Sequence, residues 1–178
     1  MLGAGLLPNH LELVICPAGG GQPLLIVPLE PGERFTLRYV HSVDHAPIWE
    51  EHSADRYGTI YIEEERFVMF GAGMGNWPGH GTLASRGPYQ VIENIHEPVG
   101  KFVLRVGGKD VDHTIIWRGQ ELHLSELAAG EAVSVSARPT SLLRRLSVRC
   151  KRGRPPNPRS VGLPWHGRLG IGDWGASK

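Results

Sequence analysis

The sequence predicts an all-β protein, folded as an antiparallel β-sandwich or an open β-barrel with short helical turns. Three observations support this prediction. From about residue 11 to residue 138, short apolar or alternating runs are separated by glycine, proline, asparagine and aspartate, which is typical of successive strands. The 24 glycines and 14 prolines favour turns over long helices. No long stretch has the period of a helix.

The first two predicted strands, Leu11–Cys16 and Pro23–Leu29, form a hairpin around the glycine-rich segment 18–21. The third, Arg34–His41, alternates so that its apolar side chains share one face, with His41 at its end. The spacing of the later runs is typical of a sandwich or an open barrel. These further strands are expected at Ile48–Ser53, Thr59–Glu63, Arg66–Phe70, Tyr89–Ile95, Lys101–Val106, His113–Trp117, Glu121–Leu124 and Ala132–Ala137.

The chain divides into an N-terminal extension, 1–10, one all-β domain, 11–149, and a basic tail rich in proline and glycine, 150–178. Within the domain, the glycine-rich sequence from Phe70 to Pro88 predicts a loop that carries function. Short helical turns are expected at 125–130, ended by a glycine, and at Thr140–Leu146.

Composition excludes few classes of protein. The formal net charge of +1 gives no general reason to expect a nucleic-acid partner. Cys16 and Cys150 are too few for a disulfide framework, although one bridge between them is compatible with the sequence. The start of the chain lacks the basic and apolar regions of an export signal, and no later run reaches the roughly 20 apolar residues of a membrane span. We therefore expect a soluble chain and assign it no compartment.

The densest group of polar side chains lies between His41 and His52. If the strands on either side of Pro47 pair, His41 would meet Glu50 or His52 across the sheet. Imidazole nitrogen and carboxylate oxygen can together bind a divalent metal, or they can form a hydrogen-bonded pair that orients a ligand. His45 completes the candidate metal-binding set.

Such a metal site would need more ligands, for which the candidates are His80, Glu63 and Glu64. No spacing such as HExxH enforces this chemistry. The alternative is structural, with His41 hydrogen-bonded at the end of the sheet and the other histidines solvated. The sequence therefore requires no cofactor, and a divalent metal is its one candidate.

A hydrolase would use Ser42 as nucleophile, with His41 or His45 as base and Asp44 or Glu50 to orient the base. Neighbouring strand residues point to opposite faces, so Ser42 and His41 cannot meet by adjacency. The sequence also has no GxSxG motif. A binding module is favoured over an enzyme, and a metal-binding protein or metal-dependent hydrolase is the alternative.

The glycine loop offers a second candidate site. Gly71, Gly73 and Gly75 would let the backbone approach a ligand or partner, with Met74 and Trp77 supplying apolar contact. A wide connection between strands that needs positive φ would explain the same glycines. No helix follows the loop, so it is not a phosphate-binding loop.

The basic tail could contact an anionic membrane surface. Its prolines, and the lack of aromatic residues among its basic side chains, argue against nucleic-acid binding. The basic residues are Arg144, Arg145, Arg149, Lys151, Arg152, Arg154 and Arg159.

The stretch PLEPGERFTLRYVHSVDHAPIWEEHSAD, followed by IYIEEERFVMFGAGM, resembles the DUF1850 family, a domain of unknown function. The family pattern has a strand ending in His-Ser-Val, a Pro-hydrophobic-x-Glu segment, a Glu-x-x-Phe strand and a Phe-Gly-Ala-Gly turn. These motifs match His41 to Val43, Pro47 to Glu50, Glu64 to Phe67 and Phe70 to Gly73. The resemblance covers residues 11–138, and Asp44-His45-Ala46 departs from it where the family has a threonine before the proline.

Members of this family are encoded beside the solute-binding protein and permease of TAXI-type TRAP transporters. The resemblance therefore implies a bacterial accessory protein near the outer face of the inner membrane, with the permease or solute-binding protein as partner. Many members carry an N-terminal signal or membrane segment, which this sequence does not show.

We hypothesise a non-catalytic accessory domain that binds a transporter component, or a small ligand bound for it. Its site would form where the end of the third strand and the glycine turn meet at one rim of the sheet. The residues of this candidate site are His41, Ser42, Glu50, Glu64, Phe70, Gly71, Gly73 and Trp77.

Overall fold

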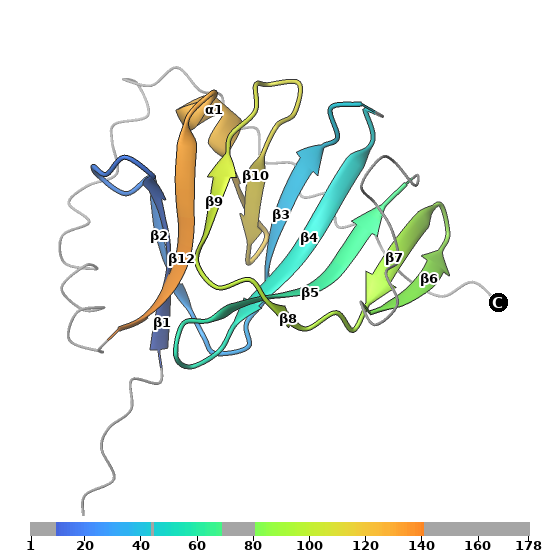
Figure 1. The fold of residues 1–178 in the computed structure, drawn as a ribbon, viewed down its shortest axis with the longest axis horizontal. Helices are drawn as coiled ribbons and strands as arrows, with labels where there is room; N and C mark the ends of the chain where they lie inside the picture. Colours follow the sequence, from blue (N-terminus) through green and yellow to red (C-terminus); the bar gives the residue numbers. More distant parts are fainter. Residues whose placement is uncertain (1–9, 44, 69–80, 141–178) are drawn as a thin grey trace, which may run out of the picture.

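A computed structural model describes residues 10–43, 45–68 and 81–140, which form two antiparallel β-sheets and one short helix (Figure 1). The four-stranded sheet has the order β2-β1-β12-β9. Its strands are β1 (His10–Pro17), β2 (Leu25–Leu29), β9 (Phe102–Arg105) and β12 (Ala132–Thr140). The all-β prediction is confirmed. The two sheets do not close into a barrel, so the sandwich fits better of the two predicted architectures.

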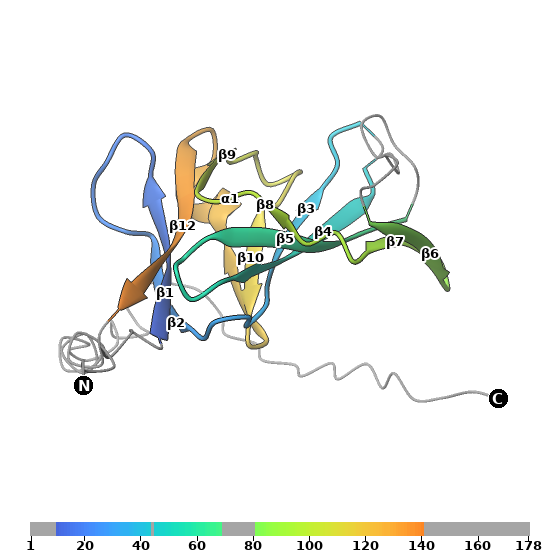
Figure 2. The same ribbon diagram turned by 60° about the horizontal axis from the view of Figure 1, so that its bottom comes forward.

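The larger sheet has the order β11-β10-β3-β4-β5-β7-β6, with β8 paired to the start of β5. Its strands are β3 (Phe35–Val40), β4 (Pro47–Ala54), β5 (Ile60–Phe67), β6 (Thr82–Arg86), β7 (Tyr89–Glu93), β8 (Glu97–Pro98), β10 (Thr114–Trp117) and β11 (Gln120–His123). Helix α1 (Leu124–Ala128) follows β11 directly. Figure 2 shows the smaller sheet at one end of the molecule and the β6–β7 hairpin at the other.

Two clusters of buried apolar side chains form the core of the fold. The main cluster joins the smaller sheet to β3 and β10, because alternate residues of β1 and of β3 place apolar side chains on the face between the sheets. Burial of each large aliphatic side chain in it contributes about 1.5–3 kcal/mol. A smaller cluster lies on β4, β5 and β7, and Tyr39 packs against both clusters. The smaller cluster consists of Ile48, Ile62, Phe67, Ile92 and Ile95.

The turn between β4 and β5 packs against the smaller sheet. Gly58 has φ of 89°, and a Cβ atom there would lie 2.5 Å from the carbonyl oxygen of Ala137 in β12. Glycine is therefore required at this position for both its backbone angle and its close approach. Asp55 fixes the same turn, because its carboxylate accepts hydrogen bonds from the backbone amides of Tyr57 at 2.9 Å and Thr59 at 2.8 Å.

Strand β5 is continuous where the sequence predicted two strands, Thr59–Glu63 and Arg66–Phe70. The register explains the error. Glu51 lies opposite Glu64, and His52 lies opposite Ile62, so Glu63 is the extra residue of a β-bulge. The bulge shifts the alternation of apolar residues by one position, which looks like a gap between strands in the sequence.

Two further strands differ from the expectations. The predicted loop from Phe70 to Pro88 contains strand β6, which pairs with β7. The two-residue strand β8 was not expected. Thr140 ends strand β12, and the rest of the helical turn expected at Thr140–Leu146 lies outside the described residues. The helical turn expected at 125–130 is confirmed by α1, with Gly130 at φ of 80° just beyond it.

Within the described residues, no helix is long and apolar enough to cross a membrane.

Candidate binding pocket

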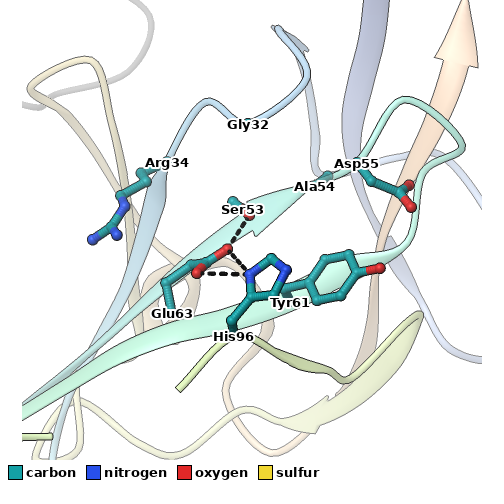
Figure 3. A pocket seen from close by; sticks show the side chains of 8 residues that line it. All are labelled: Gly32, Arg34, Ser53, Ala54, Asp55, Tyr61, Glu63 and His96. Atoms are coloured by element: carbon teal, nitrogen blue, oxygen red, sulfur yellow. Dashed lines mark hydrogen bonds and ion pairs between the residues drawn. The ribbon is translucent and has the colours of Figure 1, made fainter. Parts of the chain in front are cut away.

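A pocket of about 420 Å³ lies on the outer face of the larger sheet (Figure 3). Ile60 and Ile62 of β5 point into the core, so the alternate residue Tyr61 points outward. Ser53 of β4 lies directly opposite Tyr61 and shares its face. The lining residues are Gly32, Arg34, Ser53, Ala54, Asp55, Tyr61, Glu63 and His96.

Four segments of the chain supply this lining. The connection from β2 to β3 brings Gly32 and Arg34, and the Gly32 amide donates a hydrogen bond of 2.8 Å to the Ala54 carbonyl. Strands β4 and β5 bring the residues of the pocket floor. The link between β7 and β8 brings His96. The neighbouring Ile95 fixes this link, because its backbone amide donates a hydrogen bond of 3.2 Å to the Glu63 carbonyl. The bulge therefore places the Glu63 side chain in the pocket and its carbonyl under the rim.

Glu63 is held by two donors from opposite sides. The Ser53 hydroxyl donates to one carboxylate oxygen at 2.6 Å. The Nδ1 atom of His96 lies 3.1 Å from both carboxylate oxygens, and since the carboxylate only accepts, Nδ1 carries the proton. Figure 3 shows all three side chains converging at this point.

The ring of His96 is fixed although its side chain is 69% exposed. The Tyr61 ring stacks on it in parallel, with centroids 4.6 Å apart and planes 5° apart. The backbone of His96 has φ of 47°, which few residues other than glycine and asparagine adopt. With Nδ1 directed at Glu63, the other ring nitrogen, Nε2, is left to meet a ligand.

The pKa of Glu63 is lowered. Burial alone would raise the pKa, but the hydrogen bonds from Ser53 and His96, with the positive charges of His96 and Arg34, outweigh burial. Glu63 is therefore a stable anion inside the pocket at neutral pH. It acts as a fixed acceptor that orients the histidine.

This arrangement suits binding better than nucleophilic catalysis. A serine nucleophile needs its hydroxyl hydrogen-bonded to a histidine that acts as base. Here the Ser53 hydroxyl donates its hydrogen bond to Glu63, and the ring of His96 donates to the same carboxylate. The carboxylate thus lies between the two groups that would have to meet.

A second polar group lies on the inner face of the same strands. Glu50 and Glu65 are directly opposite each other in β4 and β5, and the Tyr39 hydroxyl donates to Glu50 at 2.8 Å. Burial raises the pKa of Glu50 to about 7, and the charge of Glu65 adds to the rise, against the hydrogen bond from Tyr39. Burial also raises the pKa of Tyr39. At neutral pH, Glu50 is close to half protonated.

His52 lies beside this group as part of the core. Its ring stacks between Phe35, at 5.3 Å, and Phe102, at 5.5 Å, and so joins the two sheets. Its Nδ1 donates to the backbone carbonyl of Glu50 at 3.1 Å, and its Nε2 lies 3.9 Å from the Glu50 carboxylate. Burial lowers the pKa of His52 to about 4, so the ring is neutral at pH 7.

The predicted meeting of His41 with Glu50 or His52 does not occur. The strands do pair, but Glu50 lies opposite Leu37 and His52 opposite Phe35. His41 lies in the β3–β4 connection, where its amide donates to the Ala46 carbonyl at 2.9 Å. The connection takes up the six residues 41–46, a length that the sequence pattern did not reveal.

The four residues predicted to bind a metal therefore lie in two different parts of the structure. His41 and His45 lie in the connection, with His45 at φ of 52°, while Glu50 and His52 lie on the inner face. Throughout the described ranges, no group of three or more histidine, cysteine, aspartate or glutamate residues could hold a metal ion.

Other predicted site residues are also apart from the pocket. Ser42 is exposed in the connection. Glu64 lies opposite Glu51 and forms an ion pair with Arg66 at 3.3 Å. Several candidates fall outside the described residues, as do the tail from residue 150 and the partner cysteine proposed for Cys16. These candidates are Asp44, Phe70, Gly71, Gly73, Met74, Gly75, Trp77, His80 and Cys150.

Sequence reasoning missed Arg34, Ser53, Tyr61 and His96, and considered Glu63 only as an additional metal ligand. One signal was available. The apolar residues alternate on even numbers at Ile60 and Ile62 and then on an odd number at Phe67, which indicates a bulge among the three glutamates between them.

Comparison with known proteins gives one result. A family model described as a domain of unknown function, DUF1850, matches residues 35–124, which include all of β3, β4 and β5. No curated protein and no solved structure matches the chain.

Proposed function

This chain belongs to the DUF1850 family, and we propose that it is a non-catalytic binding domain that takes a small polar ligand in the pocket around Glu63 and His96. We further propose that it is an accessory protein of a TRAP-type solute transporter of the TAXI subfamily. The first part rests on geometry. The second rests on the sequence motifs shared with the family.

The observation that carries the proposal is the fixed orientation of His96. A carboxylate holds one ring nitrogen at 3.1 Å, and a parallel tyrosine ring 4.6 Å away sets the plane of the imidazole. An exposed side chain would otherwise lose conformational entropy when it binds a ligand. A site that is ordered beforehand avoids most of that loss, which is typical of ligand pockets.

The frame of the pocket is also rigid. Asp55 and Gly58 fix the turn between β4 and β5, and the bulge fixes the position of Glu63 within β5. The volume of about 420 Å³ falls within the roughly 300–1,000 Å³ typical of small-molecule sites. A small molecule or a single side chain of a partner protein would fit.

The pocket can be tested by amide shifts in ¹H–¹⁵N spectra. Purified protein is titrated with a panel of small polar molecules that includes acids, amines and neutral polyols. We expect at least one of them to shift amides of β4, β5 and the 94–96 segment. We expect His96→Ala to lower the affinity measured from these shifts at least tenfold. Glu126→Gln, on the exposed surface of α1, is the control and should bind as the wild type does. Amide shifts confined to residues outside the pocket, or an affinity unchanged in His96→Ala, would exclude this site.

The transporter role needs a separate experiment. The tagged protein is purified from cells that also produce the permease and the solute-binding protein of a TAXI-type TRAP transporter from the same organism. We expect one of the two to co-purify in stoichiometric amount. If neither does, and neither binds the purified protein in solution, the transporter role is wrong while the pocket stands.

A further inference from the structure

We infer that the ligand of this pocket carries an oxyanion, a carboxylate or a phosphate group, which Arg34 and His96 bind. The inference rests on the proposed function, because it gives the chemical class of the ligand in that same pocket. It follows from asking which hydrogen-bonding groups of the lining are already satisfied within the protein.

The acidic groups of the pocket are satisfied. Asp55 accepts two backbone amides of its own turn, at 2.9 Å and 2.8 Å. Glu63 accepts the Ser53 hydroxyl at 2.6 Å and the His96 ring at 3.1 Å. Both carboxylates therefore serve the structure of the pocket, and their negative charge is offset by these donors.

The basic groups of the pocket have N–H donors that no described residue accepts. Arg34 is exposed, and among the residues that the structure describes it makes no hydrogen bond or ion pair. Figure 3 shows its side chain on the far side of Glu63 from His96. The charge of Arg34 still reaches the pocket, since it helps to lower the pKa of Glu63. A guanidinium offers five N–H donors and no acceptor, so it binds an acceptor and in particular an oxyanion.

His96 has the same preference when its ring is protonated. Its Nδ1–H is committed to Glu63, and a protonated ring presents a second N–H at Nε2. Arg34 and the protonated His96 then supply charge-assisted donors from the two sides of Glu63, and Tyr61 adds a flat apolar wall.

The test uses four probes: malonate, inorganic phosphate, putrescine and glycerol. Binding of each probe to the purified protein is measured by titration calorimetry and by amide shifts. We expect malonate or phosphate to bind at the pocket, and the stronger of the two identifies the carboxylate or the phosphate as the natural group. Arg34→Gln should weaken this binding about 10- to 100-fold, as expected for loss of a charged hydrogen bond. Raising the salt concentration should weaken it further.

Arg56→Gln is the matched control. Arg56 is also exposed and lies on the neighbouring turn against the Tyr57 ring, at 4.8 Å, but it does not line the pocket. Binding should be unchanged in this variant. Both arginines are exposed, so thermal unfolding should show that each variant folds.

The outcomes separate the inference from the proposed function. If putrescine or glycerol shifts the pocket amides and the two anions do not, the inference is overturned and the binding function stands. If an anion binds equally well to Arg34→Gln, the inference is overturned as well. If the panel and all four probes leave the pocket amides unchanged, both are wrong.

Discussion

Glu63 and Glu50 lie on adjacent strands, each with a hydroxyl donor and a histidine nearby, yet their pKa values move in opposite directions. Glu63 faces outward, where the Ser53 hydroxyl and two cationic side chains outweigh its burial. Glu50 faces inward, where the Tyr39 hydroxyl alone opposes burial and the charge of Glu65. The comparison teaches that the number of donors and the sign of the neighbouring charge decide what a carboxylate does in this sheet.

The largest effect is expected from Glu50→Gln. The pKa of Glu50 rises from 4.5 to about 7 on folding, so the folded protein holds a proton that the unfolded chain releases between these values. His52, whose pKa burial lowers to about 4, stabilises the fold as pH rises through the same range. The contribution of Glu50 to the free energy of unfolding should fall by about 3 kcal/mol as pH rises from about 4.5 to 7. In Glu50→Gln this fall should disappear, leaving the variant more stable than the wild type at pH 8. Urea unfolding at several pH values measures this.

Glu64→Gln is the control for that experiment, since Glu64 lies on the outer face beside Arg66. The control should keep the wild-type dependence on pH between 5 and 8. An equal dependence in Glu50→Gln and the wild type would show that Glu50 is ionised in the folded protein, and the contrast with Glu63 would be lost.

A smaller effect is expected from Ser53→Ala. Ser53 is buried, and loss of its hydrogen bond to a charged carboxylate should cost about 1–2 kcal/mol at pH 7. The pKa of Glu63 should rise towards its ordinary value. Since a lowered pKa stabilises the fold above the unfolded value and is lost as pH falls, acid unfolding of Ser53→Ala should begin at a higher pH. Ser85→Ala, which removes an exposed bond to Gln90 of 3.0 Å, should change neither quantity.

The smallest effect on stability is expected from His96→Gln. The ion pair with Glu63 is held by a side chain that is 69% exposed, and exposed pairs contribute about 0–1 kcal/mol. Unfolding in urea should therefore change by less than about 1 kcal/mol, and 1 M salt should remove most of the difference. A loss above about 2 kcal/mol would mean that His96 is structural, and its proposed role in binding would lose support.

Much of the fold was accessible from the sequence because strand alternation is a local signal. The apolar face of β3 and the β1–β2 hairpin were predicted from residues adjacent in the chain, and the structure confirms both. The split of β5 shows the limit of this signal, since a bulge and a turn both interrupt alternation.

The candidate site was much less accessible. His96 lies 33 residues from Glu63, and their contact depends on how the link from β7 brings β8 against the start of β5. The pairing of His41 with Glu50 failed for a related reason, because the length of one connection sets the register of the whole hairpin. Residue types alone identified Glu63 as a candidate, but not its partners.

The bulge also separates the pocket carboxylate from the regular pairing of β4 and β5. Glu63 is an added residue in β5, so the two halves of the strand would stay in register with β4 if it were deleted. The one extra residue thus supplies both the pocket carboxylate and the carbonyl that accepts the Ile95 amide, while the buried residues of β5 on either side keep facing the core. A designer could install or erase such a site on this scaffold by the same one-residue change.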